Sequence, residues 1–324
     1  MLFNRVKLHL SISLLTLSSA LFANLSGDIK TSITEISPDI SAEAYYQTHK
    51  DDLTIRPDGT GLQILFESNH HYYLLAGPRA QKLLTLNGGK IEDANASFLQ
   101  QLKEEYNEET FGQLQITQKN SHYYLLIKGK AYPLTIHTDK TMLQEKPQQF
   151  AYVTFTGVAN HIDKEALINL ADELTPTALF WEKLGSYLYL KVKEAPQGEQ
   201  FSTYWQAEQD NLNAMLAQMT HEYERLMQEK SLIITPELAF NVATIEQAWD
   251  ILRNINNYQT LKFHFQNTVG RYSERKGYYL FDAAQLLLNA QNPGQNIYDI
   301  RGEYVTNAFF NLDAITRIFP LIVS

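Results

Sequence analysis

The sequence predicts an α+β protein with a mixed β-sheet, followed by a mainly α-helical C-terminal domain. Short apolar segments rich in β-branched and aromatic residues recur with glycine or polar residues between them, which is typical of strands. One amphipathic helix interrupts this series, and from about residue 197 long stretches with helical spacing replace the strands. A chain of 324 residues is long enough for two domains with separate cores.

The N-terminal residues 1–23 have the pattern of a secretory signal peptide, because Arg5 and Lys7 precede the apolar segment Leu8–Ala23. We therefore expect export, to a periplasm or into the medium. The alternatives are an uncleaved segment that anchors the chain to a membrane, or a buried first helix. No later run approaches the roughly 20 apolar residues of a membrane helix, so no transmembrane helix is expected in the mature chain.

Residues 24–56 form a polar N-terminal segment, and the turn signal Pro57-Asp58-Gly59 opens a second unit that we place at 57–196. A short helix is expected at Asp163–Glu173, with Thr175-Pro176 marking its end or the start of the next element. The strands of this unit are expected at Gly61–Glu67, Tyr72–Ala76, His122–Ile127, Ala131–His137 and Phe150–Thr156.

The stretch 88–112 contains the predicted amphipathic helix. Gly88 and Gly89 predict a glycine turn before it, because glycine adopts backbone conformations that other residues avoid. Ser97 and Gln100 fit a capping box, so the helix should begin near residue 98. A stripe of three apolar residues at helical spacing should face the core: Leu99, Leu102 and Tyr106.

Three carboxylates of this helix, Glu105, Glu108 and Glu109, fall together on the flank beside the apolar stripe, while Glu104 points nearly opposite the core. Carboxylates at this spacing repel one another, by a few tenths of a kcal/mol per pair. A hard divalent cation such as Mg²⁺ prefers oxygen ligands and would convert the repulsion into binding. The alternatives are a solvated acidic helix after a glycine turn, or another metal-binding fold.

The stretch resembles the Nudix box, whose pattern is G-x5-E-x7-R-E-U-x-E-E-x-G-U with U a bulky apolar residue. The segments Gly88–Glu92 and Glu105–Thr110 match its two ends. Both ends fit only with one extra residue around 95–97, and Gly112 then stands one position late, behind Phe111.

Two box positions differ from the family. The early glutamate falls on Asn95 or Ala96, and the arginine falls on Glu104. Without the extra residue Lys103 would occupy the arginine position, but Asn107 would then replace a metal-binding glutamate.

The resemblance implies a Nudix-like α/β/α sandwich with a mixed sheet. It also implies a hydrolase that cleaves a pyrophosphate bond in a nucleoside diphosphate linked to another moiety. Glu105, Glu108 and Glu109 would hold Mg²⁺ or Mn²⁺, which would help to activate a water, and Glu92 with the Gly88/Gly89 backbone would shape the loop. The alternative is a catalytically inactive module that binds a nucleotide or a protein, as an exported or translocated effector.

Arg79 and Lys90 flank the predicted site and could contact phosphate oxygens, although an ordinary exposed cation is an equal interpretation of each.

Residues 197–324 are predicted to be mainly helical, and they carry no motif that assigns them a role. They could offer a surface to a protein partner. Helices are expected at Phe201–Lys230, Ile245–Ile255, Tyr278–Ala290 and Phe309–Ile318.

Composition excludes several classes of protein. The formal net charge of −9 argues against a nucleic-acid-binding surface. The chain has no cysteine, so disulfides, thiolate nucleophiles and cysteine-ligated zinc are excluded. The sequence has no His-Glu-x-x-His motif, no Gly-x-Ser-x-Gly elbow and no phosphate-binding loop.

Overall fold

The computed structural model describes residues 29–32, 36–79, 82–84, 87–144, 150–229, 239–269, 277–290 and 297–305. The predicted signal peptide and the predicted helix Phe309–Ile318 lie outside these residues. Within them, no helix combines the length and apolar character needed to cross a membrane.

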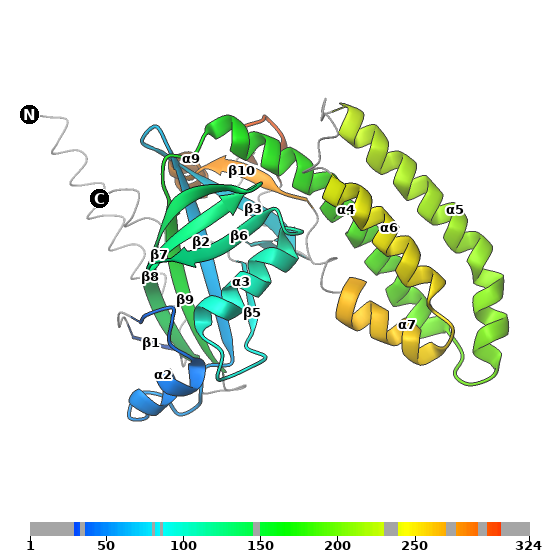
Figure 1. Ribbon diagram of the computed structural model, residues 1–324, viewed down its shortest axis with the longest axis horizontal. Coiled ribbons are helices and arrows are strands. Elements are labelled where there is room, and N and C mark those ends of the chain that lie inside the picture. The colour runs from blue at the N-terminus through cyan, green and yellow to red at the C-terminus, as the bar shows by residue number, and fades with distance from the viewer. Residues whose placement is uncertain are drawn as a thin grey trace, which may run out of the picture.

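A mixed sheet forms the centre of the molecule, which confirms the predicted α+β class (Figure 1). Its main path follows the order β10-β3-β2-β9-β8-β7-β6, while β1, β4 and β5 pair with β8, β3 and β2 respectively. The pairing of β2 with β9 is parallel, and the other pairings are antiparallel. The strands are β1 (Ile29–Ser32), β2 (Gly59–Ser68), β3 (His71–Arg79), β4 (Lys82–Leu84), β5 (Asn87–Lys90), β6 (Leu114–Lys119), β7 (His122–Ile127), β8 (Lys130–Gln144), β9 (Phe150–Ala159) and β10 (Tyr279–Asp282).

Helices accompany this sheet, and α4 extends from it into a helical group with α5, α6 and α7 (Figure 1). A small hairpin, β11 (Ile297–Tyr298) with β12 (Tyr304–Val305), ends the described chain. The helices are α2 (Ala42–Thr48), α3 (Phe98–Glu109), α4 (Lys164–Glu194), α5 (Gln200–Glu229), α6 (Ala239–Arg253), α7 (Tyr258–His264), the π-helical η1 (Phe265–Val269) and α9 (Ala283–Ala290).

Two clusters of apolar side chains lie on opposite faces of the sheet. Leu62 and Ile64 of β2 join the larger cluster, which also contains Leu102 of α3. The next residue after Ile64, Leu65, joins a second cluster with Leu286 of α9. Successive strand side chains point to opposite faces, so α3 and α9 cover the sheet from opposite sides.

Helix α4 continues through Pro176, so the prediction that a helix ends near Glu173 or at Thr175-Pro176 is wrong. A proline inside a helix costs about 3 kcal/mol, since it removes a hydrogen bond and crowds the preceding turn. The Thr175 hydroxyl donates to the Ala171 carbonyl at 2.8 Å, in the turn where Pro176 removes a backbone hydrogen bond. The apolar face remains buried beyond the proline, at Trp181 for example, and this burial outweighs the local cost.

The predicted helix Tyr278–Ala290 is wrong in its first part, because Tyr279–Asp282 forms β10 and α9 begins only at Ala283. Strand β10 pairs with β3, with Leu280 opposite Leu75. The Asp282 side chain then accepts the Gln285 N–H at 3.0 Å, as an N-cap does. Residues well beyond 197 therefore complete the sheet that begins in the predicted unit 57–196.

Candidate functional site

Gly88 and Gly89 lie in strand β5, not in the turn that the sequence predicts, and neither has a positive φ. Gly88 stands opposite Gly61 of β2. A Cβ on Gly88 would press against the Gly61 Cα and would come within 2.7 Å of the Tyr152 hydroxyl. That hydroxyl donates to the Thr60 carbonyl at 2.6 Å, so the tyrosine crosses the two strands where they have no side chains. Close packing, and not turn geometry, requires glycine at residue 88.

Gly89 faces helix α3 instead. A Cβ at this residue would lie 2.6 Å from the carboxylate carbon of Glu105, well inside van der Waals contact. The missing side chain therefore makes the space into which the Glu105 carboxylate fits. Strand β5 and the acidic flank of α3, which sequence analysis assigned to one site, are in contact.

Helix α3 has the predicted start and the predicted buried face. The Ser97 side chain accepts the Gln100 N–H at 3.2 Å, and the helix begins at Phe98. Leu99, Leu102 and Tyr106 are all buried. The Tyr106 hydroxyl also donates to the Leu62 carbonyl of β2 at 2.9 Å, which fixes the helix on the sheet.

The three candidate glutamates differ in exposure. Glu105 and Glu108 are half-buried, whereas Glu109 is only 5% exposed. Glu104, at the position of the family arginine, is exposed and accepts a hydrogen bond from Gln100 Nε2 at 3.3 Å. In the part of the chain that the structure describes, no three His, Asp or Glu side chains are grouped closely enough to hold a metal ion.

The remaining predicted residues lie near β5 or at the end of β3. Lys90 and Glu92 are exposed, and Lys90 directly follows Gly89 in β5. The backbone of Arg79 ends β3 and pairs with Lys82 of β4, but its side chain lies outside the described part of the chain. The structure thus joins Glu105 to Gly89 and leaves the phosphate-binding predictions untested.

Helix α3 ends in a left-handed turn that sequence analysis did not predict. The helix caps at Thr110, after which Phe111 has φ 52° and Gly112 has φ 76°. Helices commonly end on one left-handed residue, usually glycine. Here Phe111 takes that role although its ring is buried at 2% exposure. In the register with one extra residue, Phe111 stands where the Nudix pattern has its glycine.

A residue from the C-terminal part of the chain contacts this helix end. The Tyr278 hydroxyl donates a hydrogen bond to the Glu109 carbonyl. The contact joins residues 169 positions apart, so no local sequence signal could reveal it.

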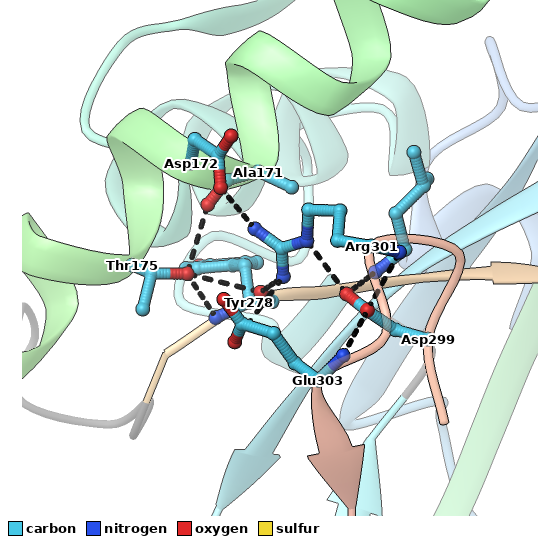
Figure 2. A network of polar contacts seen from close by, with 8 residues as sticks. Ala171, Asp172, Thr175, Tyr278, Asp299, Arg301 and Glu303 are labelled. Atoms are coloured by element: carbon cyan, nitrogen blue, oxygen red, sulfur yellow. Dashed lines mark hydrogen bonds and ion pairs between the residues drawn. The ribbon is translucent and has the colours of Figure 1, made fainter. Parts of the chain in front are cut away.

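A polar network surrounds the Tyr278 backbone (Figure 2). Arg301 donates to the Tyr278 carbonyl through Nη2, to Asp299 through Nε and to Asp172 of α4 through Nη1, each at 2.7 Å. Burial alone would lower the pKa of Arg301, but the carboxylates of Asp299, Glu303 and Asp172 outweigh burial and raise it. This network ties the β11–β12 hairpin to α4 and to β10.

Comparison with family models, with curated proteins and with solved structures finds no match to this chain. The Nudix resemblance therefore rests on residues 88–112 and on the order of the surrounding elements.

Proposed function

We propose that this protein is a divalent-metal-dependent, Nudix-like hydrolase that cleaves a pyrophosphate bond in a nucleoside diphosphate linked to another moiety. The observation that carries the proposal is the position of the Glu105 carboxylate, which lies against Gly89 in the space that a side chain at that residue would fill. Two segments that the box pattern links in sequence, the Gly-Gly strand and the acidic helix, are in contact where that pattern requires a common site.

The donor set suits Mg²⁺ or Mn²⁺, because both ions prefer carboxylate oxygen. Glu105, Glu108 and Glu109 would hold the ion, and Gly89 leaves room for a carboxylate where any other residue would place a side chain. A bound ion of this kind neutralises diphosphate charge and lowers the pKa of a bound water. With Glu105 kept over Gly89, rotation of the Glu108 and Glu109 side chains would bring their oxygens towards it.

The arrangement of the sheet and its helices supports the proposed Nudix-like α/β/α sandwich. Helices α3 and α9 lie on opposite faces of a mixed sheet. Two strands, the Gly-Gly segment, a helix and a further strand occur in the order that the resemblance implies. However, the short strand β4 precedes the glycines, which lie in strand β5 instead of a loop, and β6 precedes the predicted strand at His122–Ile127. Lys90, exposed beside Gly89, and Arg79 are proposed to contact the phosphates.

The test is metal-dependent hydrolysis of a panel containing ADP-ribose, NADH, dinucleoside polyphosphates and nucleoside triphosphates, with Mg²⁺ or Mn²⁺. We expect Glu105→Gln to abolish turnover without unfolding the protein. The matched control is Glu104→Gln, since Glu104 is the adjacent helix residue and is exposed. Near wild-type turnover in Glu105→Gln, or no turnover by the folded wild-type chain, would remove the proposal.

A second candidate function is a catalytically inactive module that binds a nucleotide or a protein. The observation in its favour is Glu104, which stands in place of the family arginine and is hydrogen-bonded to Gln100 on the exposed side of α3. A residue of opposite charge in that position does not orient another glutamate. Thermal stabilisation by a nucleotide without any hydrolysis would identify this function, and the helices after residue 197, α5 to α7, would then offer the surface for a protein partner.

Export remains our proposal for the location, on the basis of the basic and apolar pattern of residues 1–23. An exported hydrolase of this type requires a supply of nucleoside diphosphate compounds in its compartment, or delivery into another cell. Fractionation of cells that express the full chain would test it, since retention in the cytoplasm would contradict export.

A further inference from the structure

The C-terminal end of α3 depends on a side chain from outside the helix. The last carbonyls of a helix have no partner within it. Here the backbone N–H groups of residues 110–112 donate to the carbonyls of residues 106–108. The Glu109 carbonyl is reached by the Tyr278 hydroxyl instead. Tyr278 therefore adds, from a distant part of the chain, a cap to the turn of α3 that carries Glu108 and Glu109.

Tyr278 itself is held rigidly. Its backbone N–H donates to Thr175 Oγ1 at 3.1 Å, and its carbonyl accepts from Arg301 Nη2 at 2.7 Å. The ring is 2% exposed within the larger core cluster. The backbone bonds to α4 and to Arg301 fix the position of residue 278, and burial among core side chains keeps its hydroxyl at the end of α3.

The anchoring residues extend this support to two separate elements, α4 and the β11–β12 hairpin (Figure 2). Arg301 lies between Asp172 of α4 and Asp299 of the hairpin, and its side chain is 8% exposed. Asp299 also accepts the backbone N–H groups of Arg301 and Glu303, at 2.9 and 3.0 Å. Through Tyr278, the end of α3 is thus connected to this buried network of ion pairs and hydrogen bonds.

We propose that Tyr278 is a positioning residue for the candidate metal site, through which α4 and the β11–β12 hairpin control the placement of the α3 glutamates. The part of this inference that concerns metal rests on the proposed function. Without the hydroxyl, the last turn of α3 loses its hydrogen bond to residue 278, and it is followed by a left-handed phenylalanine. We expect that turn to open more often and to carry Glu108 and Glu109 out of place.

The test compares Tyr278→Phe, which removes only the hydroxyl, with Tyr279→Phe, which makes the same change on the neighbouring, half-exposed residue of β10. The side chain of Tyr279 packs on the second apolar cluster, away from α3. A third variant, Leu286→Ala in that cluster, lowers stability without touching the helix end. Each full-length variant is measured by hydrogen exchange at residues 106–113, by Mn²⁺ titration and by hydrolysis.

We expect Tyr278→Phe to increase exchange at residues 106–113 and to weaken Mn²⁺ binding about tenfold, the lower end of the effect seen for indirect ligand support. Tyr279→Phe should change neither, and Leu286→Ala should lower Tm but leave Mn²⁺ affinity as it is. This pattern separates positioning from general loss of stability.

Unchanged exchange in Tyr278→Phe would overturn the inference whether or not the protein binds metal. Increased exchange with unchanged Mn²⁺ affinity would overturn the positioning role while leaving the proposed function in place. A wild-type chain that binds no Mn²⁺ would overturn the proposed function and the positioning role together, and the exchange measurement, which needs no metal, would then show a purely structural cap.

Discussion

The carboxylate of Glu105 lies in the space that a side chain at Gly89 would occupy. These residues come from a sheet strand and from the helix beside it, so glycine at 89 and glutamate at 105 form a matched pair. The neighbouring Gly88 is also required, but for contact with backbone atoms of β2 and with Tyr152. The two adjacent glycines therefore make different predictions.

Gly89→Ala should reduce metal affinity and hydrolysis more than stability. The new methyl group meets the end of a flexible side chain, so the Glu105 carboxylate can rotate away at small cost to folding but leaves its seat. We expect about a tenfold loss in Mn²⁺ affinity, comparable to other changes around metal ligands, and a small change in Tm. Unaltered Mn²⁺ affinity would show that the contact between Gly89 and Glu105 does not serve a metal site.

Gly88→Ala is the matched control and should behave in the opposite way. Its methyl group would overlap the backbone of Gly61 and Thr60 in β2, which cannot move aside without separating the strands. Overpacking of this kind costs about 1–3 kcal/mol or more. Urea denaturation should show this loss in Gly88→Ala, and a variant as stable as Gly89→Ala would contradict the packing account.

Local sequence signals predicted the helix of the candidate site well. The Ser97 cap and the buried stripe of Leu99, Leu102 and Tyr106 follow from spacing alone and are confirmed. The same spacing does not reveal that Glu105 faces Gly89, because that contact depends on how β5 pairs with β2. The sequence predicts a turn at both glycines, because a glycine needed for close packing cannot be told in the sequence from one needed for a positive φ.

Contacts between distant residues account for the predictions that are wrong. Pro176 reads as a helix end, but burial of Trp181 and its neighbours on α4 holds the helix together past it. Residues 279–282 read as part of a helix, yet pairing with β3 makes them a strand. In both cases tertiary packing overrides local preference, and the residues next to Pro176 or to 279–282 in the sequence do not reveal it.

The left-handed conformation of Phe111 predicts which of two opposing effects controls stability. Replacing it by glycine relieves about 1–2 kcal/mol of backbone strain. The same change removes a buried phenylalanine ring, which costs about 3–5 kcal/mol in comparable truncations. Loss of packing should dominate, so Phe111→Gly should be less stable by about 2 kcal/mol in urea denaturation. A more stable variant would mean that the ring contributes little to the core.

Protonation of the Glu67 carboxylate should lower the stability of the protein in acid. Its carboxylate accepts the N–H groups of His161 and His70, at 2.9 and 2.8 Å, and these bonds hold the pKa of Glu67 below its usual value of 4.5. Because the pKa is lowered on folding, the carboxylate stabilises the protein above pH 4.5, and this contribution disappears as the pH falls below it.

Glu67→Gln should therefore lower stability by about 1–3 kcal/mol at neutral pH, as expected when a buried hydrogen-bonded charge is lost. Its stability should also fall less steeply than that of the wild type below pH 4.5. Thermal unfolding measured between about pH 3 and pH 7, the range that brackets carboxylate titration, checks both effects. Parallel pH profiles for the two proteins would contradict this account.

We expect loss of the buried ion pairs of Arg301 to lower stability far more than loss of an exposed ion pair. Its partner Asp299 has a fully buried side chain, so Arg301→Gln would leave that carboxylate without its cation. Removing one member of a buried pair costs about 3–5 kcal/mol. Arg301→Lys should recover only part of the loss, because one ammonium cannot reproduce the planar fork that reaches Asp299, Asp172 and Tyr278.

Arg253→Gln is the control, since Arg253 pairs with Asp250 at a surface where both side chains are more than 70% exposed. Such exposed pairs contribute less than about 1 kcal/mol to stability. Urea denaturation of the three variants should rank Arg301→Gln as least stable, Arg301→Lys as intermediate and Arg253→Gln as close to wild type. Equal stability of Arg301→Gln and Arg253→Gln would show that the network does not hold the C-terminal hairpin to the sheet.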